Sequence, residues 1–124
     1  SPLDSQIVFA GTGKGTFRSD DGAKTWTQLD EYKGITILAI AFDENGVLYS
    51  SNSYTGLSRS SDLSKTWETI KGSHLTITSI TVDSQNKIIY VAGYAPEGYQ
   101  EVFKSFDDGM SWDVVGTNRE PSTK

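Results

Sequence analysis

The sequence lacks cysteine altogether and contains one histidine and three prolines among its 124 residues. Without cysteine the chain has no disulfides, no thiolate metal ligands and no thiol nucleophile. Eleven basic residues against sixteen acidic ones give a net charge of −5, and the basic residues form no run. Such a chain offers little attraction to phosphate backbones or anionic lipids, so we expect neither nucleic acid nor a membrane as its partner.

Long hydrophobic runs are also missing, because no segment approaches the roughly 18 apolar residues that a membrane-spanning helix needs. Hydrophobic residues nonetheless make up 35% of the chain and aromatic residues 11%. This content is typical of a folded globular domain rather than of a disordered chain. The sequence shows no helical periodicity, and its apolar residues gather in short segments rich in β-branched and aromatic types. This pattern predicts strands throughout.

A repeated eight-residue segment dominates the chain. Its three copies end at tryptophans that are 41 and 45 residues apart. Each copy has a serine, an aspartate two residues later, and a threonine or serine directly before the tryptophan. Agreement at four positions in three places, at one period, indicates a repeat architecture. The residues that carry the motif are Ser19, Asp21 and Trp26, then Ser60, Asp62 and Trp67, then Ser105, Asp107, Gly109 and Trp112.

The sequence between these segments repeats as well. An apolar run at 37–42 is followed by an Asn-Gly turn and a second run at 47–51, and the runs at 77–82 and 88–92 repeat this pattern. Runs of this length between turn residues are typical of antiparallel strands. Two further strands flank each repeated segment. The unit is therefore four strands in about 43 residues, which matches one blade of a β-propeller.

These observations predict an all-β chain of three consecutive four-stranded antiparallel blades, the first of which lacks its innermost strand. Three blades leave two faces uncovered that normally stack on neighbours, and known closed propellers have at least four blades. We therefore expect association with further blades, in a longer chain or by self-association. The predicted boundaries are 2–30 for blade 1, 35–71 for blade 2, 76–116 for blade 3 and 117–124 for a polar tail.

Each repeated segment is predicted to form the hairpin between the third and fourth strands of its blade. Its aspartate is expected to accept hydrogen bonds from backbone N–H groups of the turn. Its tryptophan is expected to bury a large ring between adjacent blades. A glycine three residues before the tryptophan permits positive φ at little cost. Gly109 meets this condition, whereas Ala23 and Ser64 replace glycine, so those two turns should be strained or differently shaped.

The pattern Ser-x-Asp-x-Gly-x-Thr-Trp resembles the Asp-box, also called the bacterial neuraminidase repeat, although the first two copies lack the glycine. The segment 3–19 looks most like blades of xyloglucan-cleaving endoglucanases and of photosystem assembly factors. The resemblance implies a β-propeller whose boxes lie on the periphery, away from the ligand face, and it favours an extracytoplasmic location. It covers nearly the whole chain, yet it specifies function poorly because one fold hosts many functions.

The chain carries no complete catalytic constellation. A sialidase needs three convergent arginines, but Arg18 and Arg59 share one repeat position, which indicates a solvated strand face. Glycoside hydrolysis needs two carboxylates that flank the sugar, and the aspartates of the boxes and strand ends are committed to turns. The single histidine has no clustered ligands, so we predict no metal and no cofactor. The carboxylates left on other loops, which no spacing pairs, are Asp30, Glu31, Glu97 and Glu101.

The connections opposite the boxes are the remaining candidates for function. The loop at 94–100 is the longest of them and contributes most of the extra spacing of the third repeat. Tyrosine supplies rigid amphipathic contact area for sugars and proteins, and ordinary surface packing is the alternative explanation for the tyrosines of these loops. The candidate ligand-binding residues are Tyr32, Tyr54, His74, Tyr94, Glu97, Tyr99 and Glu101.

Two functions are compatible with this pattern. The first is a non-catalytic recognition or scaffold module that belongs to, or assembles into, a larger Asp-box propeller and binds protein or glycan through its loop face. The alternative is a fragment of a secreted, xyloglucanase-like glycoside hydrolase whose active site is shared with blades outside this chain. A binding module binds without turnover, whereas the hydrolase requires a carboxylate that faces the central cleft.

Overall fold

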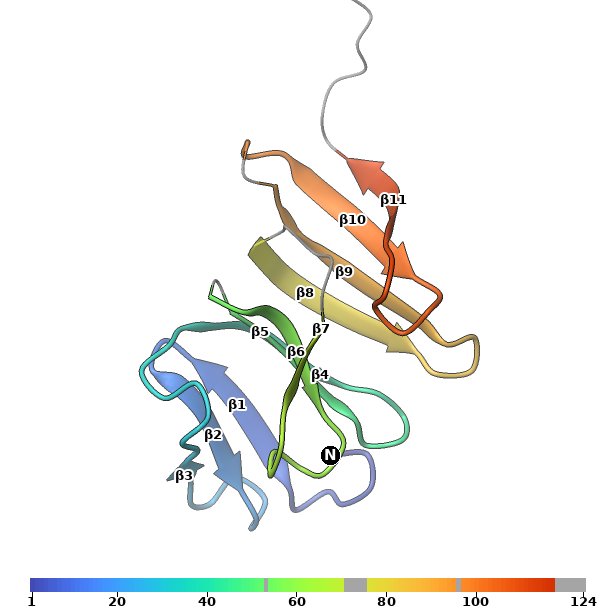
Figure 1. The fold of residues 1–124 in the computed structure, drawn as a ribbon. Helices are drawn as coiled ribbons and strands as arrows, with labels where there is room; N and C mark the ends of the chain where they lie inside the picture. Colours follow the sequence, from blue (N-terminus) through green and yellow to red (C-terminus); the bar gives the residue numbers. More distant parts are fainter. Residues whose placement is uncertain (53, 71–75, 96, 118–124) are drawn as a thin grey trace, which may run out of the picture.

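The computed structural model describes residues 1–52, 54–70, 76–95 and 97–117, which form three antiparallel sheets placed side by side (Figure 1). The first sheet has three strands and the other two have four each, which confirms the predicted all-β fold. The described residues contain no helix that is long and apolar enough to cross a membrane. The blades are, in order, β1 (Val8–Thr12), β2 (Gly15–Ser19) and β3 (Thr27–Gln28); β4 (Ile37–Phe42), β5 (Leu48–Asn52), β6 (Gly56–Ser60) and β7 (Glu68–Ile70); and β8 (Thr76–Asp83), β9 (Ile88–Tyr94), β10 (Gln100–Ser105) and β11 (Asp113–Thr117).

Each sheet follows chain order, so neighbouring strands are joined by simple turns. The register is the same in all three blades, because Phe9 pairs with Arg18, Tyr49 pairs with Arg59 and Tyr90 pairs with Lys104. This places β1 at the position of β5 and β9. Among the described residues, blade 1 therefore has no counterpart of β4 and β8, the innermost strands of the other two blades.

Burial along the strands shows how the blades stack. All five residues of β5 are buried, because blade 2 has a neighbour on both faces. In β9 buried residues alternate with partly buried or exposed ones, because the described residues cover blade 3 on one face only. Side chains of successive strand residues point to opposite faces, so this alternation identifies the uncovered face of blade 3.

The first strands of blades 2 and 3 carry a matching irregularity. The register shifts between Ile37 and Ala39 in β4 and between Ile77 and Ser79 in β8. An extra residue at a bulge shifts the alternation of side chains by one position. In β8 this directs Ile77 and Ile80 toward blade 2, where both are buried.

The main buried cluster of the described residues lies between blades 2 and 3. Blade 2 contributes Tyr49, Leu57 and Ile70, and blade 3 contributes residues of β8 and β9. Removing apolar area on this scale from water is the dominant favourable contribution to folding. The members from blade 3 are Ile77, Ile80, Ile89 and Val91.

Candidate functional site

The three boxes form the same network of hydrogen bonds at one end of the blades. In the first box, Oδ1 of Asp21 accepts the Thr25 N–H at 2.8 Å and the Ser19 hydroxyl at 2.7 Å. The Ser19 Oγ in turn accepts the Ala23 N–H at 2.9 Å. Asp62 and Asp107 repeat these bonds with the serines and the threonine or serine of their own boxes. Each box therefore ties the two ends of its own turn together.

These bonds hold the box carboxylates in the ionised form. The hydroxyl and the backbone N–H of Thr25 lower the pKa of Asp21 from 3.8 to about 2. Thr66 does the same for Asp62, whose pKa is lowered to about 2, and Ser111 lowers the pKa of Asp107 to about 2. Hydrogen bonds donated to a carboxylate favour its charged form. The box aspartates are thus engaged in their turns rather than directed at a ligand.

The turns without glycine are strained rather than differently shaped. The residue three before each tryptophan has positive φ in all three boxes, at 78° for Ala23, 73° for Ser64 and 89° for Gly109. Each is preceded by another residue with positive φ, so the hairpins have two left-handed residues in a row. Because this conformation is unfavourable for residues with a Cβ, Ala23 and Ser64 adopt it against their own preference.

The box tryptophans differ in burial. The ring of Trp67 lies edge-on to Tyr32 of the preceding loop, with the centroids 5.8 Å apart, and Trp112 packs against the cluster between blades 2 and 3. Trp26 is 41% exposed, so the expectation of a buried ring is wrong for this copy. Trp67 and Trp112 each face the preceding blade, and among the described residues blade 1 has no preceding blade to cover Trp26.

The repeated arginines are not on a solvated strand face, which corrects the interpretation from sequence. Nη1 of Arg18 donates to the Leu63 carbonyl oxygen of blade 2 at 3.0 Å, and the guanidinium lies over the Phe9 ring. Arg59 contacts both carboxylate oxygens of Asp108 in blade 3, with Nη2 2.7 Å from Oδ2. Leu63 and Asp108 occupy the same position in their boxes. Each arginine therefore contacts the box of the next blade.

The loop end is the end of the blades opposite the boxes, where the turns from β1 to β2, from β5 to β6 and from β9 to β10 lie (Figure 1). Tyr54 is 82% exposed, Tyr94 45% and Tyr99 37%. Tyr32 is instead held between blades 1 and 2, because its hydroxyl donates to Ser58 Oγ at 2.8 Å. Glu97 is exposed, and His74 lies outside the described residues. The exposed candidates thus belong to blades 2 and 3, where Tyr94 is the last residue of β9.

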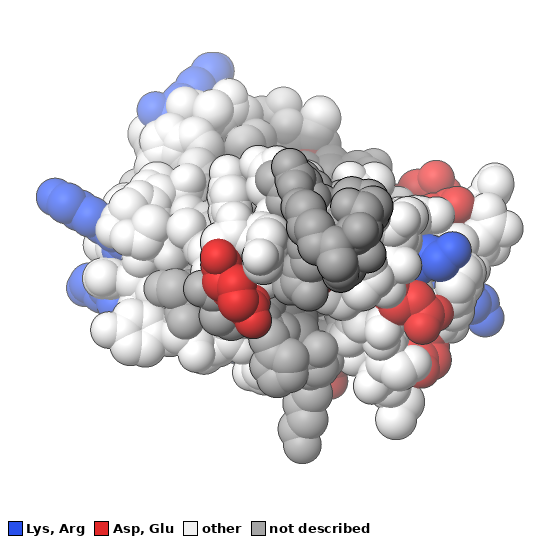
Figure 2. Space-filling view, turned by 90° about the horizontal axis from the view of Figure 1, so that it is seen from above, with Lys and Arg blue, Asp and Glu red and all other residues white. Residues whose placement is uncertain are grey.

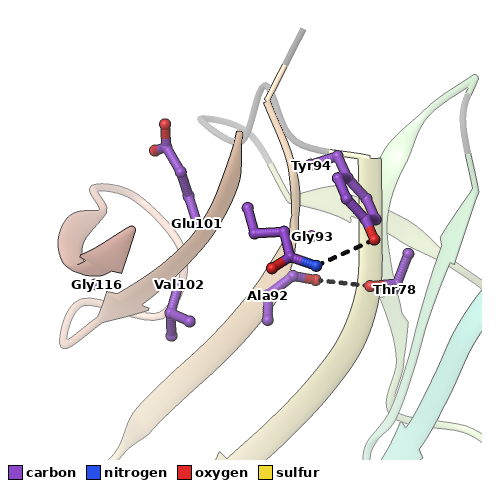
Figure 3. A pocket seen from close by; sticks show the side chains of 8 residues that line it. Thr78, Ala92, Gly93, Tyr94, Glu101, Val102 and Gly116 are labelled. Carbon is purple, nitrogen blue, oxygen red and sulfur yellow. Dashed lines mark hydrogen bonds between the residues drawn. The ribbon is translucent and has the colours of Figure 1, made fainter. Parts of the chain in front are cut away.

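A hollow of about 500 Å³ brings two of these candidates together on blade 3. Tyr94 and Glu101 both line it, and the Tyr94 hydroxyl accepts a hydrogen bond from the Gln100 amide at 3.1 Å. Figure 3 shows the Glu101 side chain rising from β10 away from that hydroxyl, while Val102 points to the other side of the strand. Neither Tyr54 nor Tyr99 is among the lining residues.

Charge is dispersed over the loop end. Viewed from above, Figure 2 shows blue and red side chains at separate points on a mostly white surface. In the part of the chain that the structure describes, no group of three or more His, Asp or Glu side chains is placed to hold a metal ion.

No protein-family model and no curated protein matches this sequence. The structure is similar to a GH74 enzyme of Niastella koreensis, with a TM-score of 0.69 and 23% identity over 90% of this chain and 19% of that chain. For a GH74 xyloglucanase of Xanthomonas campestris the TM-score is 0.67, with 16% identity over 90% of this chain and 19% of that chain.

A third similar structure is YCF48 bound to a D1 peptide, with a TM-score of 0.65 and 15% identity over 90% of this chain and 38% of that chain. This chain thus spans about a fifth of the GH74 enzymes and less than half of YCF48. Its fold corresponds to a partial β-propeller, similar over about 90% of its length to the Asp-box propellers of GH74 enzymes and YCF48.

Proposed function

We propose that this chain is a non-catalytic recognition or scaffold module of a larger Asp-box propeller and that it binds protein or glycan through its loop end. The exposure of Tyr54, Tyr94 and Tyr99 is the observation that carries this proposal. Tyrosine rings bury a large area on binding while losing little conformational entropy, and their hydroxyls add hydrogen bonds. At the opposite end, the box side chains are already engaged with one another.

The similarity to YCF48 adds support, because that structure is of a complex with a D1 peptide. A peptide ligand suits the loop end of blade 3, where the Tyr94 hydroxyl is hydrogen-bonded to the Gln100 amide and Tyr99, the residue before Gln100, is exposed. Such a surface combines apolar contact with a few oriented polar groups, as ligand sites commonly do.

Calorimetric titration with a D1 peptide and with a xyloglucan oligosaccharide tests the proposal. Binding of either probe should weaken at least about tenfold, the cost of roughly 1.4 kcal/mol, when Tyr94→Ala and Tyr54→Ala are combined. Met110→Ala is the matched control, because Met110 is as exposed as Tyr54, at 82%, but lies in a box. Equal affinity in the double variant and the parent would contradict a role for the loop end.

The second candidate is a glycoside hydrolase resembling the xyloglucanases, which the similarity to two GH74 structures favours. In that case Glu97 or Glu101 would act together with a carboxylate from blades outside this chain. Turnover of xyloglucan by the longer protein should then fall by orders of magnitude in Glu97→Gln or Glu101→Gln. If the chain is a recognition module, the same variants should leave ligand affinity nearly unchanged.

A further inference from the structure

The uncovered face of blade 3 carries the same repeat positions as the faces of blades 1 and 2 that are covered by the next blade. The hollow on this face is lined by Thr78, Ala92 and Val102, among others. In the common register, Ala92 pairs with Val102 as Ser51 pairs with Leu57. The covered faces of blades 1 and 2 therefore show what occupies such a surface when it is filled.

In blades 1 and 2 a small residue lies under the isoleucine near the start of the next blade's first strand. Gly11 of blade 1 lies directly under Ile37, because a Cβ on Gly11 would be 2.5 Å from Ile37 Cγ2. Ser51 of blade 2 lies under the start of β8, where its hydroxyl donates to the Ile77 carbonyl oxygen at 2.8 Å. Ala92 is the small residue at this position in blade 3, and the hollow lies above it.

In blades 1 and 2 a basic residue binds the box of the next blade. Arg18 binds the Leu63 carbonyl oxygen and Arg59 binds the Asp108 carboxylate. Lys104 has the same register position in blade 3, and its ammonium now lies over the ring of its neighbour Phe106, 4.8 Å from the centroid. Val102 is 36% exposed, so the hollow also offers exposed apolar area.

A third repeat position, which is aromatic in every blade, also lies on this face. The Phe9 ring of blade 1 packs edge-on against Phe42 of β4, with centroids 5.6 Å apart. Tyr49 of blade 2 is buried in the cluster with residues of β8. Tyr90 is the counterpart of both in blade 3. Three independent positions of the repeat therefore point outward from blade 3 toward a further blade.

We propose that the hollow of blade 3 docks the first strand of a further four-stranded blade, one that carries the pattern Ile-x-x-Ile-x-Phe/Val seen in β4 and β8. The leading isoleucine enters between Ala92 and Val102, and Lys104 binds a carbonyl oxygen or carboxylate at the fourth position of that blade's box. This inference rests on the partial-propeller part of the proposed function. The hollow also contains Tyr94, so Tyr54, which does not line it, reports on the loop end separately.

The alternatives within this chain do not supply that strand. A second copy presents blade 1, whose described residues have no counterpart of β4 or β8. Residues 118–124 read Asn-Arg-Glu-Pro-Ser-Thr-Lys and contain no isoleucine, leucine or valine. The occupant is therefore a distinct blade with a complete first strand.

A disulfide test uses the absence of native cysteine. A copy of residues 36–70 is joined to the C-terminus of the full chain, with Ala92→Cys in the hollow and Ile37→Cys in the appended copy. The pair Gly11→Cys and Ile37→Cys in the unextended chain is the positive control. A Cβ on Gly11 would lie 3.0 Å from Ile37 Cβ, so the two positions need to separate by only about 0.5 Å to reach the roughly 3.5–4.5 Å between the Cβ atoms of a disulfide.

Oxidation should close an intramolecular disulfide from Ala92→Cys at least about ten times faster than from Met110→Cys, because docking raises the local concentration of the partner thiol. Adding Val102→Asp should remove this advantage. Equal rates at the two positions, or disulfides formed mainly between chains, would overturn the proposal. Peptide and oligosaccharide binding, and its loss in Tyr54→Ala, are measured on the same proteins and report separately on the proposed function, because Tyr54 does not line the hollow.

Discussion

The two interfaces between blades are built on the same plan and filled differently. Both have a basic residue that contacts the next box and a small residue under an isoleucine. Between blades 2 and 3, Leu57 and its neighbours form a continuous apolar cluster. Between blades 1 and 2, the position of Leu57 is taken by Thr16, and Ser50 and Ser58 face blade 1 from β5 and β6.

The polar interface also leaves hydrogen-bonding groups unused. Thr16 and Ser50 are 1% and 0% exposed, and their hydroxyls have no hydrogen-bond partner among the described residues. Burying an unpaired hydroxyl destabilises the fold, whereas burying apolar area stabilises it. Since the stability of a repeat protein is approximately a sum of repeat and interface contributions, blade 1 should separate from blade 2 before blade 2 separates from blade 3.

Acid should have the largest effect, because it acts on all three boxes at once, and it should act on each box alike. The folded pKa of Asp21, Asp62 and Asp107 is about 2, below the ordinary value of 3.8. A depressed pKa stabilises the fold above the ordinary value, and this stabilisation is lost as pH falls from about 4 to about 2. We expect hydrogen-exchange protection of blades 1 and 3 to fall over that window by similar factors.

Asp62→Asn is the control for the acid experiment. It should reduce protection at neutral pH and make the remaining acid response shallower, because one titrating carboxylate has been removed. A pH response confined to one blade would show that the boxes do not stabilise the blades equally.

Truncating a side chain in the apolar interface between blades 2 and 3 should give the next largest effect on stability. Leu57 is fully buried, so Leu57→Ala should lower the free energy of unfolding by about 2–5 kcal/mol. Thr16→Ala, at the same repeat position, is the matched control and should change it by less than about 1 kcal/mol, because the lost hydroxyl is unpaired. Denaturant unfolding followed by tryptophan fluorescence measures both. Similar losses in the two variants would mean that the interfaces are energetically equivalent.

The blades were predictable from sequence because their signals are local and repeated. Alternating apolar runs and the periodic tryptophans predicted the strands, and the structure confirms eleven of them in three sheets. The missing innermost strand of blade 1 was predicted because residues 2–6 align with the turns after β4 and β8. All of these features depend on neighbours close in the chain.

The contacts between blades were not predictable in the same way. Arg18 and its acceptor Leu63 are 45 residues apart, Arg59 and Asp108 are 49 apart, and Tyr32 and Ser58 are 26 apart. Sequence reasoning treated the arginines as solvated and Tyr32 as a ligand-binding candidate because nothing local indicates these partners. The recurrence of a basic residue directly before each box serine was the available signal.

Backbone strain should give the next largest effect on stability, and this effect should differ between the boxes. Gly109 has φ of 89°, and a Cβ there would be 2.2 Å from Ile70 Cγ2 across the apolar interface. Gly109→Ala should therefore cost about 2–4 kcal/mol through left-handed strain and overpacking. Ala23→Gly, at the same box position in blade 1, should instead stabilise by up to about 1 kcal/mol. Thermal unfolding compares the two, and a stabilising Gly109→Ala would contradict the role assigned to this contact.

Removing the unpaired hydroxyls between blades 1 and 2 should give the smallest effect on stability. It is also the most direct test of the difference between the two interfaces. Thr16→Val and Ser50→Ala remove hydroxyls that are buried and have no partner among the described residues. Each should raise the free energy of unfolding by up to about 1 kcal/mol, because the cost of burying an unpaired polar group disappears. The gain should appear as slower hydrogen exchange in β1 and β2, with exchange in β9 and β10 unchanged. Ser58→Ala is the control, since Ser58 accepts a hydrogen bond from Tyr32 and its loss should destabilise the same interface. If Thr16→Val and Ser50→Ala destabilise as Ser58→Ala does, the hydroxyls are satisfied in solution, and the interface between blades 1 and 2 is a complete polar network rather than an underfilled copy of its neighbour.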